Sequence, residues 1–484
     1  MTKVVPYQGA ESLHNFNTKC QIMNEEFFAD KTVLVMGLGR FGGGVDVARF
    51  AANSGAKVIV TDLASRRQLS DSISQLAEFS DIEYHLGSHD PADFEQADII
   101  VANPAVAPDT EFLELARRHN KFVTSQINIF FELCPAQIIG ITGANGKSTT
   151  AALTAHLLKN AGEAKVWLSG NIGNEPLLTI MDQISPDDLV VLELSSFQLE
   201  QLAQIQKGPK VALLTNLTPN HLDRYGTFAD YCAAKENIFR FQKPDDKFPA
   251  VSIFNAEDKV GAAWFDKYEK DTGRICITFS ADDISEQIRK SFPLPGRANL
   301  SNLAAAMAVA RHFGIDDGQL KTSLPQFRGL PHRLELVAKI NGVSWYNDSK
   351  ATTPESAIAA LEAFEQPTII IAGGYDKNVA FDELGRNIAE SAKSAILLGQ
   401  TAPKVASAIR NGKMSLRAKR SNLKKRDTKI EIVDSLSGAV QLANKLAESG
   451  DVVLLSPACA SYDMFDNFEH RGRQFCELVK QIKN

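Results

Sequence analysis

The residues best suited to chemistry lie in one stretch at 140–150, with the sequence GITGANGKSTT. It follows an apolar strand and leads into a helix that is expected to begin at Ser148. Gly143 and Gly146 would let successive backbone N–H groups converge on an anion, and Lys147 adds a positive charge. The hydroxyl of Ser148 could bind Mg²⁺. The stretch therefore predicts a phosphate-binding loop, and we expect ATP as its ligand.

The spacing of this loop departs from the strict phosphate-loop pattern. It reads GxxGxxGKS, with Ile141 where that pattern has its first glycine. The alternative is an ordinary glycine-rich turn before a core helix. A lysine and a hydroxyl at the start of the helix favour the nucleotide site.

Further polar residues follow strands in the same region. Glu193 ends an apolar strand, which is where a metal partner of a phosphate loop is expected, although it could instead cap the next helix. His221 follows another strand and could reach a metal or phosphate, or serve as a structural hydrogen-bonding group. Lys235 lies in a helical stretch, where a lysine is usually solvated. Asn299 could be the N-cap of a later helix.

A second glycine-rich turn, GLGRFGGG from Gly37, follows an apolar strand near the N-terminus. It contains GxGxxG, and Asp62 ends the next expected strand. In a βαβ unit these features predict dinucleotide binding, with Asp62 on a ribose. The same geometry serves any nucleotide diphosphate, so an NAD-dependent oxidoreductase stays open as an alternative.

Strands and helices alternate along the whole chain, and 484 residues are too many for one core. We predict an N-terminal extension at 1–28 and three α/β domains at 29–134, 135–330 and 331–484. The first and third are expected to be Rossmann-like, and the second a P-loop-type ATPase domain with a mostly parallel sheet. Polar residues after strands of the third domain would lie where such sheets bind ligands.

Composition excludes several classes of protein. The net charge of −6 argues against a nucleic-acid-binding surface, and the six scattered cysteines indicate reduced thiols. With no apolar run long enough for a membrane span, we expect a soluble cytoplasmic protein. A basic insertion at about 413–427 is either a solvated surface segment or an arm for RNA or an anionic membrane.

Together these residues resemble the Mur ligase family over roughly residues 30–484. The motifs that carry the resemblance are GITGANGKST, GNIG at 170–173, ELSSFQLE at 193–200, NHLDRY at 220–225, AAK ending at Lys235, PHR ending at Arg333, NDSKAT at 347–352 and SPACASYDMFDNFEHRG from Ser456. SSFQLE and SPACAS are similar to those of the members that add D-glutamate. The resemblance implies an ATP-dependent ligase that adds D-glutamate to UDP-N-acetylmuramoyl-L-alanine through an acyl phosphate, in peptidoglycan synthesis.

The resemblance also assigns roles residue by residue. Catalysis would involve Lys147, Glu193, His221 and Lys235, the lysine carrying a CO₂-derived carbamate. Two Mg²⁺ ions would be held by Ser148, Glu193, His221 and Lys235. ATP would be bound by Gly143, Asn145, Gly146, Lys147, Ser148, Thr149, Asn299, Arg333 and Asp348. The UDP substrate would lie on Gly39, Arg40, Phe41, Asp62, Asn171, Ser195 and His221. D-Glutamate would be bound by Thr352, Lys377, Ser461 and Phe468.

The chain departs from the family pattern in the first domain and at one nucleotide position. Ala298 replaces a histidine, Asn103-Pro104-Ala105 replaces SPG, and Gln126 to Ile129 lacks the expected acids. These changes affect the expected uridine contacts more than the chemistry. The partners implied are small molecules, without nucleic acid or membrane insertion, and the chain is expected to be a monomer. A ligase for another amino acid or for folate, and a binding protein with a decayed site, are the remaining alternatives.

Overall fold

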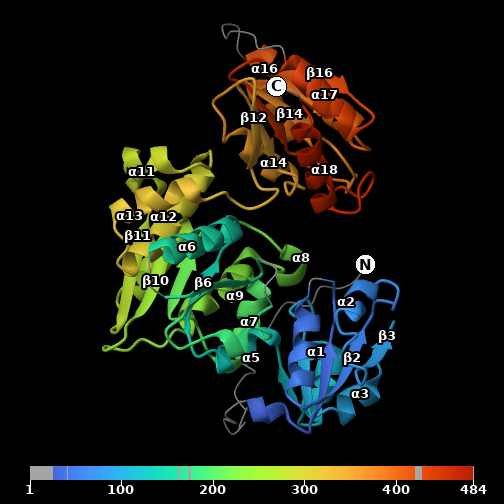
Figure 1. Ribbon diagram of the computed structural model, residues 1–484, viewed down its shortest axis with the longest axis vertical. Helices are drawn as coiled ribbons and strands as arrows, with labels where there is room; N and C mark the ends of the chain where they lie inside the picture. The colour runs from blue at the N-terminus through green and yellow to red at the C-terminus, as the bar shows by residue number, and fades with distance from the viewer. Residues whose placement is uncertain (1–24, 41, 162–163, 173–175, 420–427, 483–484) are drawn as a thin grey trace. The chain divides into compact units, whose positions relative to one another are not determined.

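The computed structural model describes residues 25–40, 42–161, 164–172, 176–419 and 428–482. Three separate sheets follow one another along the chain, and each is layered with helices (Figure 1). This confirms the predicted α/β class with mostly parallel sheets. Phe41, residues 1–24 of the extension and residues 420–427 of the basic insertion lie outside the described residues.

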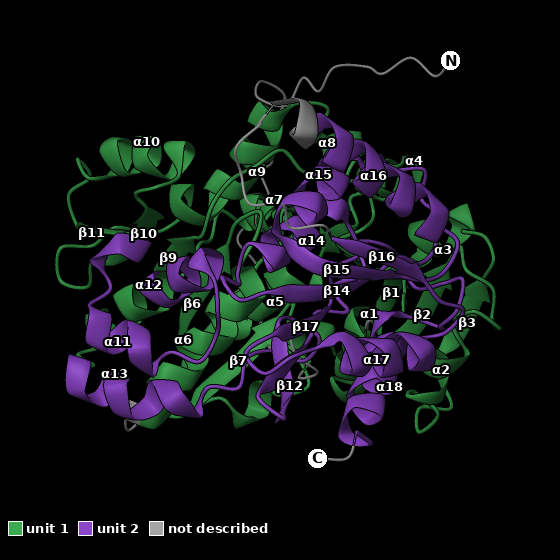
Figure 2. Ribbon diagram, turned by 90° about the horizontal axis from the view of Figure 1, so that it is seen from above, with its two compact units in different colours: residues 1–280, 305–316 green, residues 281–304, 317–484 purple. Residues whose placement is uncertain are grey.

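The chain divides into two compact units, which Figure 2 colours separately. One comprises residues 1–280 and 305–316, and holds the first two sheets. The other comprises residues 281–304 and 317–484, and holds the third sheet.

The first sheet has the order β3-β2-β1-β4-β5, all parallel. Its strands are β1 (Thr32–Met36), β2 (Lys57–Asp62), β3 (Glu83–Leu86), β4 (Ile99–Ala102) and β5 (Phe122–Thr124). Its helices are η1 (Glu25–Phe28), α1 (Gly43–Asn53), α2 (Ser70–Ser74), α3 (Pro91–Gln96), α4 (Glu111–Arg118) and α5 (Gln126–Leu133). Alternate residues of β1 face opposite cores, since Val33 packs with α1 and α5 whereas Leu34 packs with α3 and α4.

The second sheet has the order β11-β10-β9-β6-β8-β7 and is also parallel. Its strands are β6 (Gln137–Thr142), β7 (Val166–Gly170), β8 (Leu189–Glu193), β9 (Val211–Leu214), β10 (Ala250–Asn255) and β11 (Arg274–Phe279). Its helices are α6 (Lys147–Ala161), η2 (Met181–Gln183), α7 (Ser196–Ile205), α8 (Leu222–Tyr225), α9 (Phe228–Arg240) and α10 (Lys259–Tyr268). Three neighbouring strands, β9, β6 and β8, end at the same edge, so the residues that follow them are brought together.

The third sheet has the order β12-β13-β17-β14-β15-β16, with only β12 antiparallel. Its strands are β12 (Glu335–Ile340), β13 (Val343–Asn347), β14 (Thr368–Ala372), β15 (Ala392–Leu397), β16 (Lys429–Ile432) and β17 (Val452–Leu455). Its helices are α14 (Pro354–Leu361), α15 (Asp382–Ser391), α16 (Ala402–Lys419), α17 (Leu436–Leu446) and α18 (Phe468–Lys480). Before it come η3 (Ala281–Asp283), α11 (Glu286–Ser291), α12 (Arg297–His312), α13 (Asp317–Ser323) and η4 (Leu324–Gln326). The start of the basic insertion, residues 413–419, continues helix α16.

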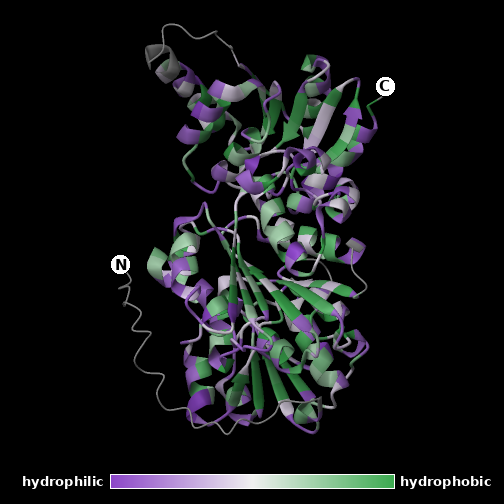
Figure 3. Cartoon of the chain, turned by 90° about the vertical axis from the view of Figure 1, so that its left-hand side faces the viewer, coloured by the Kyte–Doolittle hydropathy of each residue, from purple (hydrophilic) through white to green (hydrophobic). Residues whose placement is uncertain are grey.

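Hydropathy explains the layering. Figure 3 shows apolar colours concentrated on the strands, whereas the helices carry both polar and apolar faces. The central strands β9 and β17 are buried throughout, and β6 is buried after its first residue. Strands that are covered on both faces need continuous apolar sequences, and these chain segments provide them. No helix in the described ranges is long and apolar enough to cross a membrane.

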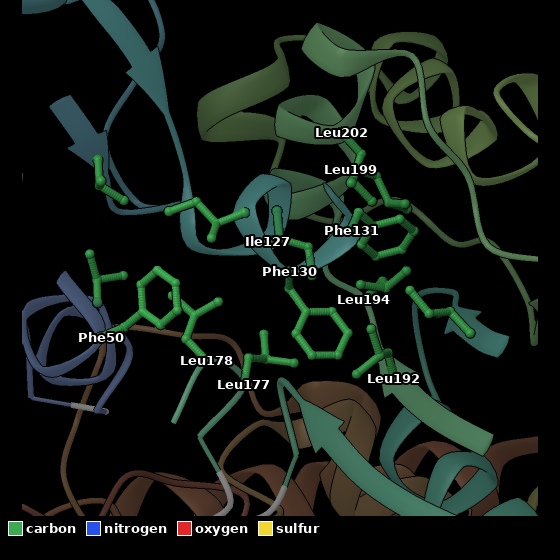
Figure 4. Close-up of a cluster of buried hydrophobic side chains, with 14 of the residues drawn as sticks. Phe50, Ile127, Phe130, Phe131, Leu177, Leu178, Leu192, Leu194, Leu199 and Leu202 are labelled. Carbon is green, nitrogen blue, oxygen red and sulfur yellow. The ribbon is translucent and has the colours of Figure 1, made fainter. Parts of the chain in front are cut away.

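One apolar cluster joins the first two sheets within their compact unit (Figure 4). Phe130 of α5 lies at its centre, fully buried, with Leu192 of β8 and Leu199 of α7 on one side. Phe50 of α1 and Leu178 complete it from the other side. The cluster contains side chains from both of the first two domains, so these domains share one continuous core. Burial of each such side chain contributes roughly 1.5–3 kcal/mol to stability.

Candidate active site

The predicted phosphate loop lies between β6 and α6. Gly143 has a φ of 148°, and a Cβ there would overlap Oγ1 of Thr215, so only glycine fits. The next residues are held by the segment after β9: Ala144 N donates to Asn216 O (2.8 Å), and Asn145 N donates to Asn216 Oδ1 (3.0 Å). The loop is therefore shaped by a neighbouring strand end as well as by its own glycines.

The helix that follows the loop begins at Lys147, as the sequence predicted for this region. The ammonium of Lys147 donates to the carbonyl of Ala144 (2.9 Å), so it lies over the loop. Ser148 and Thr149 are buried in the first turn of α6. The positive end of the helix dipole and a lysine thus face the same loop, an arrangement suited to a polyphosphate.

Lys235 of α9 is buried beside this loop with only 2% of its surface exposed. Its Nζ donates to Oγ1 of Thr142 (3.1 Å), the last residue of β6, and Thr142 in turn donates to the carbonyl of Leu194 (2.8 Å). Burial lowers the pKa of Lys235 well below its usual value, and the positive charge of Lys147 lowers it further, whereas Glu193 acts in the opposite direction. The lowered pKa increases the fraction of Lys235 that is present as the neutral, nucleophilic amine.

Glu193 lies at the end of β8, directly opposite Ile141 of β6 in the sheet register. Its carboxylate is buried, and its Oε2 has no hydrogen-bond partner among the described residues. A buried carboxylate oxygen without a partner is costly, and a hard cation would satisfy it. The next helix is capped by Ser195 and not by Glu193, so the alternative role of Glu193 as a cap is wrong.

A metal at this site would need ligands beyond acidic and imidazole side chains. No group of three or more His, Cys, Asp or Glu side chains in the described part of the chain is placed to bind a metal. Glu193, the hydroxyl of Ser148 and substrate phosphates together offer the oxygen atoms that Mg²⁺ prefers. The residues present therefore fit a magnesium ion that is shared with a nucleotide.

His221 follows β9 and precedes α8, with a backbone in the left-handed region (φ 51°). Such a conformation is uncommon for a residue other than glycine, and it often marks functional positions. The imidazole ring lies against Phe197 and Tyr231, with ring centroids 5.1 and 6.3 Å away. Desolvation lowers the pKa of His221; Asp223 opposes the shift and the charges of Lys235 and Lys147 add to it. The ring is therefore neutral at neutral pH.

Two predicted substrate residues, Asn171 and Ser195, lie near the end of β8. Asn171 N donates to the carbonyl of Glu193 (3.0 Å), which places Asn171 beside the end of β8. The hydroxyl of Ser195 forms a capping box with Gln198 at the start of α7. The side chain of Asn171 is exposed, and Ser195 is half-buried.

In the first domain, the predicted Asp62 supports the glycine-rich loop. Its Oδ2 accepts from Gly39 N (3.0 Å) and its Oδ1 accepts from Ala64 N (2.8 Å). Ser72 also donates to Gly39 O (2.7 Å), and Arg40 is exposed. Both oxygens of Asp62 are thus engaged with backbone groups, and its contact with a ribose stays a prediction.

The second unit holds the other predicted nucleotide residues. Asp348 follows β13 and is buried; it accepts from Ser456 Oγ (2.8 Å) and Leu334 N (3.2 Å). Burial raises the pKa of Asp348 to about 7, against the lowering effect of these hydrogen bonds and of Arg333. Asn299 lies within the first turn of α12, which begins at Arg297, so its alternative role as an N-cap is wrong.

The predicted D-glutamate residues lie after three adjacent strands of the third sheet, β13, β17 and β14. Ser461 follows β17, and its neighbour Ala460 forms a bridge with Tyr375, which follows β14. Phe468 begins α18, and its carbonyl accepts from Ser349 Oγ (2.8 Å). Lys377 is exposed and Thr352 is half-buried, so both side chains are accessible to a ligand.

Sequence reasoning missed several residues that build these sites. Thr142, Thr215 and Asn216 shape the phosphate loop, and their place at strand ends was the available signal. Arg471 was also missed: its buried guanidinium donates to Ser349 O (2.8 Å) and Cys459 O (3.1 Å). It joins the segments after β13 and β17, a role that sequence spacing does not reveal.

Comparison with known proteins agrees with this geometry. Family models match in three consecutive parts: the Mur ligase MurD-like N-terminal domain at 31–125, the Mur ligase middle domain at 141–310, and the Mur ligase glutamate ligase domain at 332–459. A relative from Roseiflexus sp. is 39% identical, with 94% of this chain and 99% of the relative covered. The chain belongs to the Mur ligase family.

Other Mur ligase relatives extend the comparison. The Roseiflexus protein and one from Acetivibrio thermocellus (38% identical, 96% of this chain and 100% of the relative covered) are both named UDP-N-acetylmuramoylalanine–D-glutamate ligase. Among solved structures, a UDP-N-acetylmuramate–alanine ligase from Thermotoga maritima has a TM-score of 0.55 at 19% identity, covering 94% of this chain and 100% of that one. A MurF ligase from Thermotoga maritima in complex with ADP has a TM-score of 0.52 at 18% identity, covering 95% and 97%. These structures share the Mur ligase fold.

Proposed function

We propose that this Mur ligase adds D-glutamate to UDP-N-acetylmuramoylalanine at the expense of ATP, forming an amide bond in peptidoglycan synthesis. The observation that carries the proposal is the convergence of Lys147, Glu193 and a buried Lys235 of lowered pKa around one phosphate loop. The near full-length relatives that bear this activity in their names support the choice of substrates.

The reaction joins two anions and therefore needs local positive charge. An oxygen of the alanine carboxylate attacks the γ-phosphorus of ATP, and the bond to the β-phosphate oxygen breaks to release ADP. The amine of D-glutamate then attacks the acyl phosphate carbon, loses a proton, and phosphate leaves. Lys147 and the N–H groups of the loop stabilise the negative charge of the transferred phosphoryl group.

Mg²⁺, when bound, would neutralise phosphate charge, and Ser148, Glu193 and His221 are the residues proposed to hold two such ions. Lys235 is proposed to act after reaction with CO₂. Its neutral amine forms an N–C bond with CO₂ and releases one proton, which converts the neutral amine into an anionic, carboxylate-like group. The depressed pKa of Lys235 supports this step, since a protonated amine has no lone pair for the attack.

The remaining assignments extend the proposal to the other modules. Gly39, Arg40, Asp62 and Asn171 would bind the UDP substrate, Asn299, Arg333 and Asp348 the nucleotide, and Thr352, Lys377, Ser461 and Phe468 would bind D-glutamate. We expect a monomer in the cytoplasm that binds only small molecules.

The test is phosphate release from ATP by the purified full chain with Mg²⁺ and UDP-N-acetylmuramoyl-L-alanine, with amino acids added one at a time. Release only with D-glutamate is the expected result. Release with another amino acid would show the same type of ligase reaction with a different amino-acid specificity. Reduction of NAD⁺ without phosphate release would instead support the oxidoreductase alternative.

A further inference from the structure

A buried carboxylate lies between the first two sheets of the chain. Asp46, in the first turn of α1, is 1% exposed. Its Oδ2 accepts from the backbone N of Leu178 (2.8 Å) and from Nε2 of Gln126 (2.5 Å). Its Oδ1 accepts from the backbone N of Thr179 (2.9 Å) and from the hydroxyl of Thr179 (2.5 Å). Four donors therefore converge on one side chain.

The partners of Asp46 connect two sites that the reaction needs at once. Asp46 lies on the helix that directly follows the glycine-rich loop of the first domain. Leu178 and Thr179 lie in the connection from β7 to η2, which begins at Asn171 beside Glu193. The Asp46 carboxylate thus joins the helix after the proposed UDP-binding loop to the β7–η2 connection, which begins beside Glu193 at the end of β8.

The surrounding core cannot provide the same positional accuracy. The apolar cluster around Phe130 and Leu178 is extensive, but hydrophobic packing is non-directional and tolerates small sliding movements. Hydrogen bonds to a charged acceptor are stronger than neutral ones and fix direction as well as distance. Asp46 adds such directional hydrogen bonds between the two domains at this point.

We propose that Asp46 is a positioning residue for the UDP-linked substrate, which would reach from the first domain to the phosphate loop. This inference rests on the proposed function. A substrate held at both ends reacts only when its carboxylate is placed accurately, and a displacement of about 1 Å can cost about a hundredfold in rate. ATP is bound by the second domain's own loop, so its binding should not depend on Asp46.

The test compares Asp46→Asn with Asp188→Asn in the full chain. An asparagine at 46 keeps the size but turns an N–H₂ group toward donors, so at least one backbone hydrogen bond is lost. Asp188 is a matched control: it is also buried and accepts from Trp167 Nε1 (2.8 Å) and Ser185 N (3.0 Å), but its partners all belong to the second domain.

For Asp46→Asn we expect kcat/KM for the UDP substrate to fall about 10- to 100-fold, with the KM for ATP changed less than about twofold. The amides of Leu178 and Thr179 should exchange faster with solvent. Asp188→Asn should change neither kcat/KM for the UDP substrate relative to KM for ATP nor the amide exchange rates of residues 178–179. Equal KM effects in both variants, or unchanged exchange at 178–179 in Asp46→Asn, would overturn the proposal.

Failure of the proposed function would look different. A wild-type chain that neither binds the UDP substrate by calorimetry nor releases phosphate would refute the ligase activity, and with it a substrate role for Asp46. Amide exchange needs no substrate, so it would still decide whether Asp46 joins the two domains. Substrate binding by the wild type together with an unchanged kcat/KM in Asp46→Asn would instead refute the positioning role alone.

Discussion

The Nζ atom of Lys235 lies 3.1 Å from the Oγ1 atom of Thr142, the residue that ends β6 and precedes the phosphate loop. The hydroxyl of Thr142 uses its proton for Leu194 O, so its lone pairs face the amine. Tyr231 covers the lysine from another side, with the Nζ atom 5.2 Å from the ring centroid. The amine is thus held in a fixed, desolvated position beside Lys147 and Glu193.

Replacing Lys235 tests the proposed carbamate. Lys235→Ala should lose at least about 99% of ligase activity, because removing a group that acts in the transition state raises the activation free energy by several kcal/mol. A short carboxylic acid added to the buffer should restore part of the activity by supplying the missing carboxylate. Activity is measured as phosphate release over a series of acetate and propionate concentrations.

Lys235→Arg is the control for charge, since arginine keeps a cation in place but cannot react with CO₂ under these conditions. It should be as inactive as the alanine variant and should not respond to the acids. Normal activity in either variant would refute the carbamate.

Glu193→Gln should separate stability from activity. Oε2 of Glu193 is buried and has no hydrogen-bond partner among the described residues. An uncharged amide costs less to bury, so the variant should be about 1–3 kcal/mol more stable than the wild type in EDTA. Its activity should fall about a hundredfold or more, and the Mg²⁺ concentration for half-maximal activity should rise. Thermal unfolding in EDTA and a magnesium titration measure the two effects. Lower stability in EDTA together with unchanged magnesium dependence would contradict this account.

Asp348 should make the stability of the second unit depend on pH. Its folded-state pKa is about 7 and its usual value is 3.8, so between these pH values the folded protein binds more protons than the unfolded chain. The free energy of unfolding should therefore fall as pH rises, by about 2–3 kcal/mol from pH 5 to pH 8.

Asp348→Asn resembles the protonated acid and should remove this slope. Trp345 is buried in the core of the same sheet, two residues before the end of β13, and reports its unfolding. Urea unfolding, followed in a Trp167→Phe, Trp264→Phe background at several pH values, gives the comparison. Parallel pH profiles with and without Asp348 would show that another group is responsible.

Gly143→Ala should weaken nucleotide binding. The backbone at Gly143 lies at φ 148° and a Cβ would overlap Oγ1 of Thr215, so the loop has to move. We expect ATP affinity to fall more than about tenfold and the free energy of unfolding to fall by about 1–3 kcal/mol.

Gly314→Ala is the matched control for the loop glycine. Gly314 also has a positive φ (81°), but a Cβ there would meet nothing within 4 Å. This variant should lose only the unfolding free energy that an alanine with a positive φ costs. Its ATP affinity, measured by calorimetry, should stay normal. Equal ATP affinities in the two alanine variants would contradict a specific role for Gly143.

Much of the fold followed from local patterns. Apolar runs such as Val33 to Met36 and Val452 to Leu455 became buried strands, since a parallel sheet covered on both faces requires such runs. The phosphate loop was predicted from its own residues, because glycine, lysine and a hydroxyl at a helix start are adjacent in sequence. The role of Lys235 was not predictable in this way, since a lysine in a helix is normally solvated.

The sequence by itself determined the α/β class, the phosphate loop and the strand ends at which polar residues gather. The reason is physical: these features depend on neighbours within a few residues, where periodicity and turn chemistry operate. Only the tertiary structure decided that Lys235 is buried against Thr142, that Oε2 of Glu193 has no hydrogen-bond partner in the described ranges, and that Asp46 accepts from Thr179. Each of these depends on contacts between segments far apart in the chain, and burial and hydrogen-bond partners are properties of the packed structure.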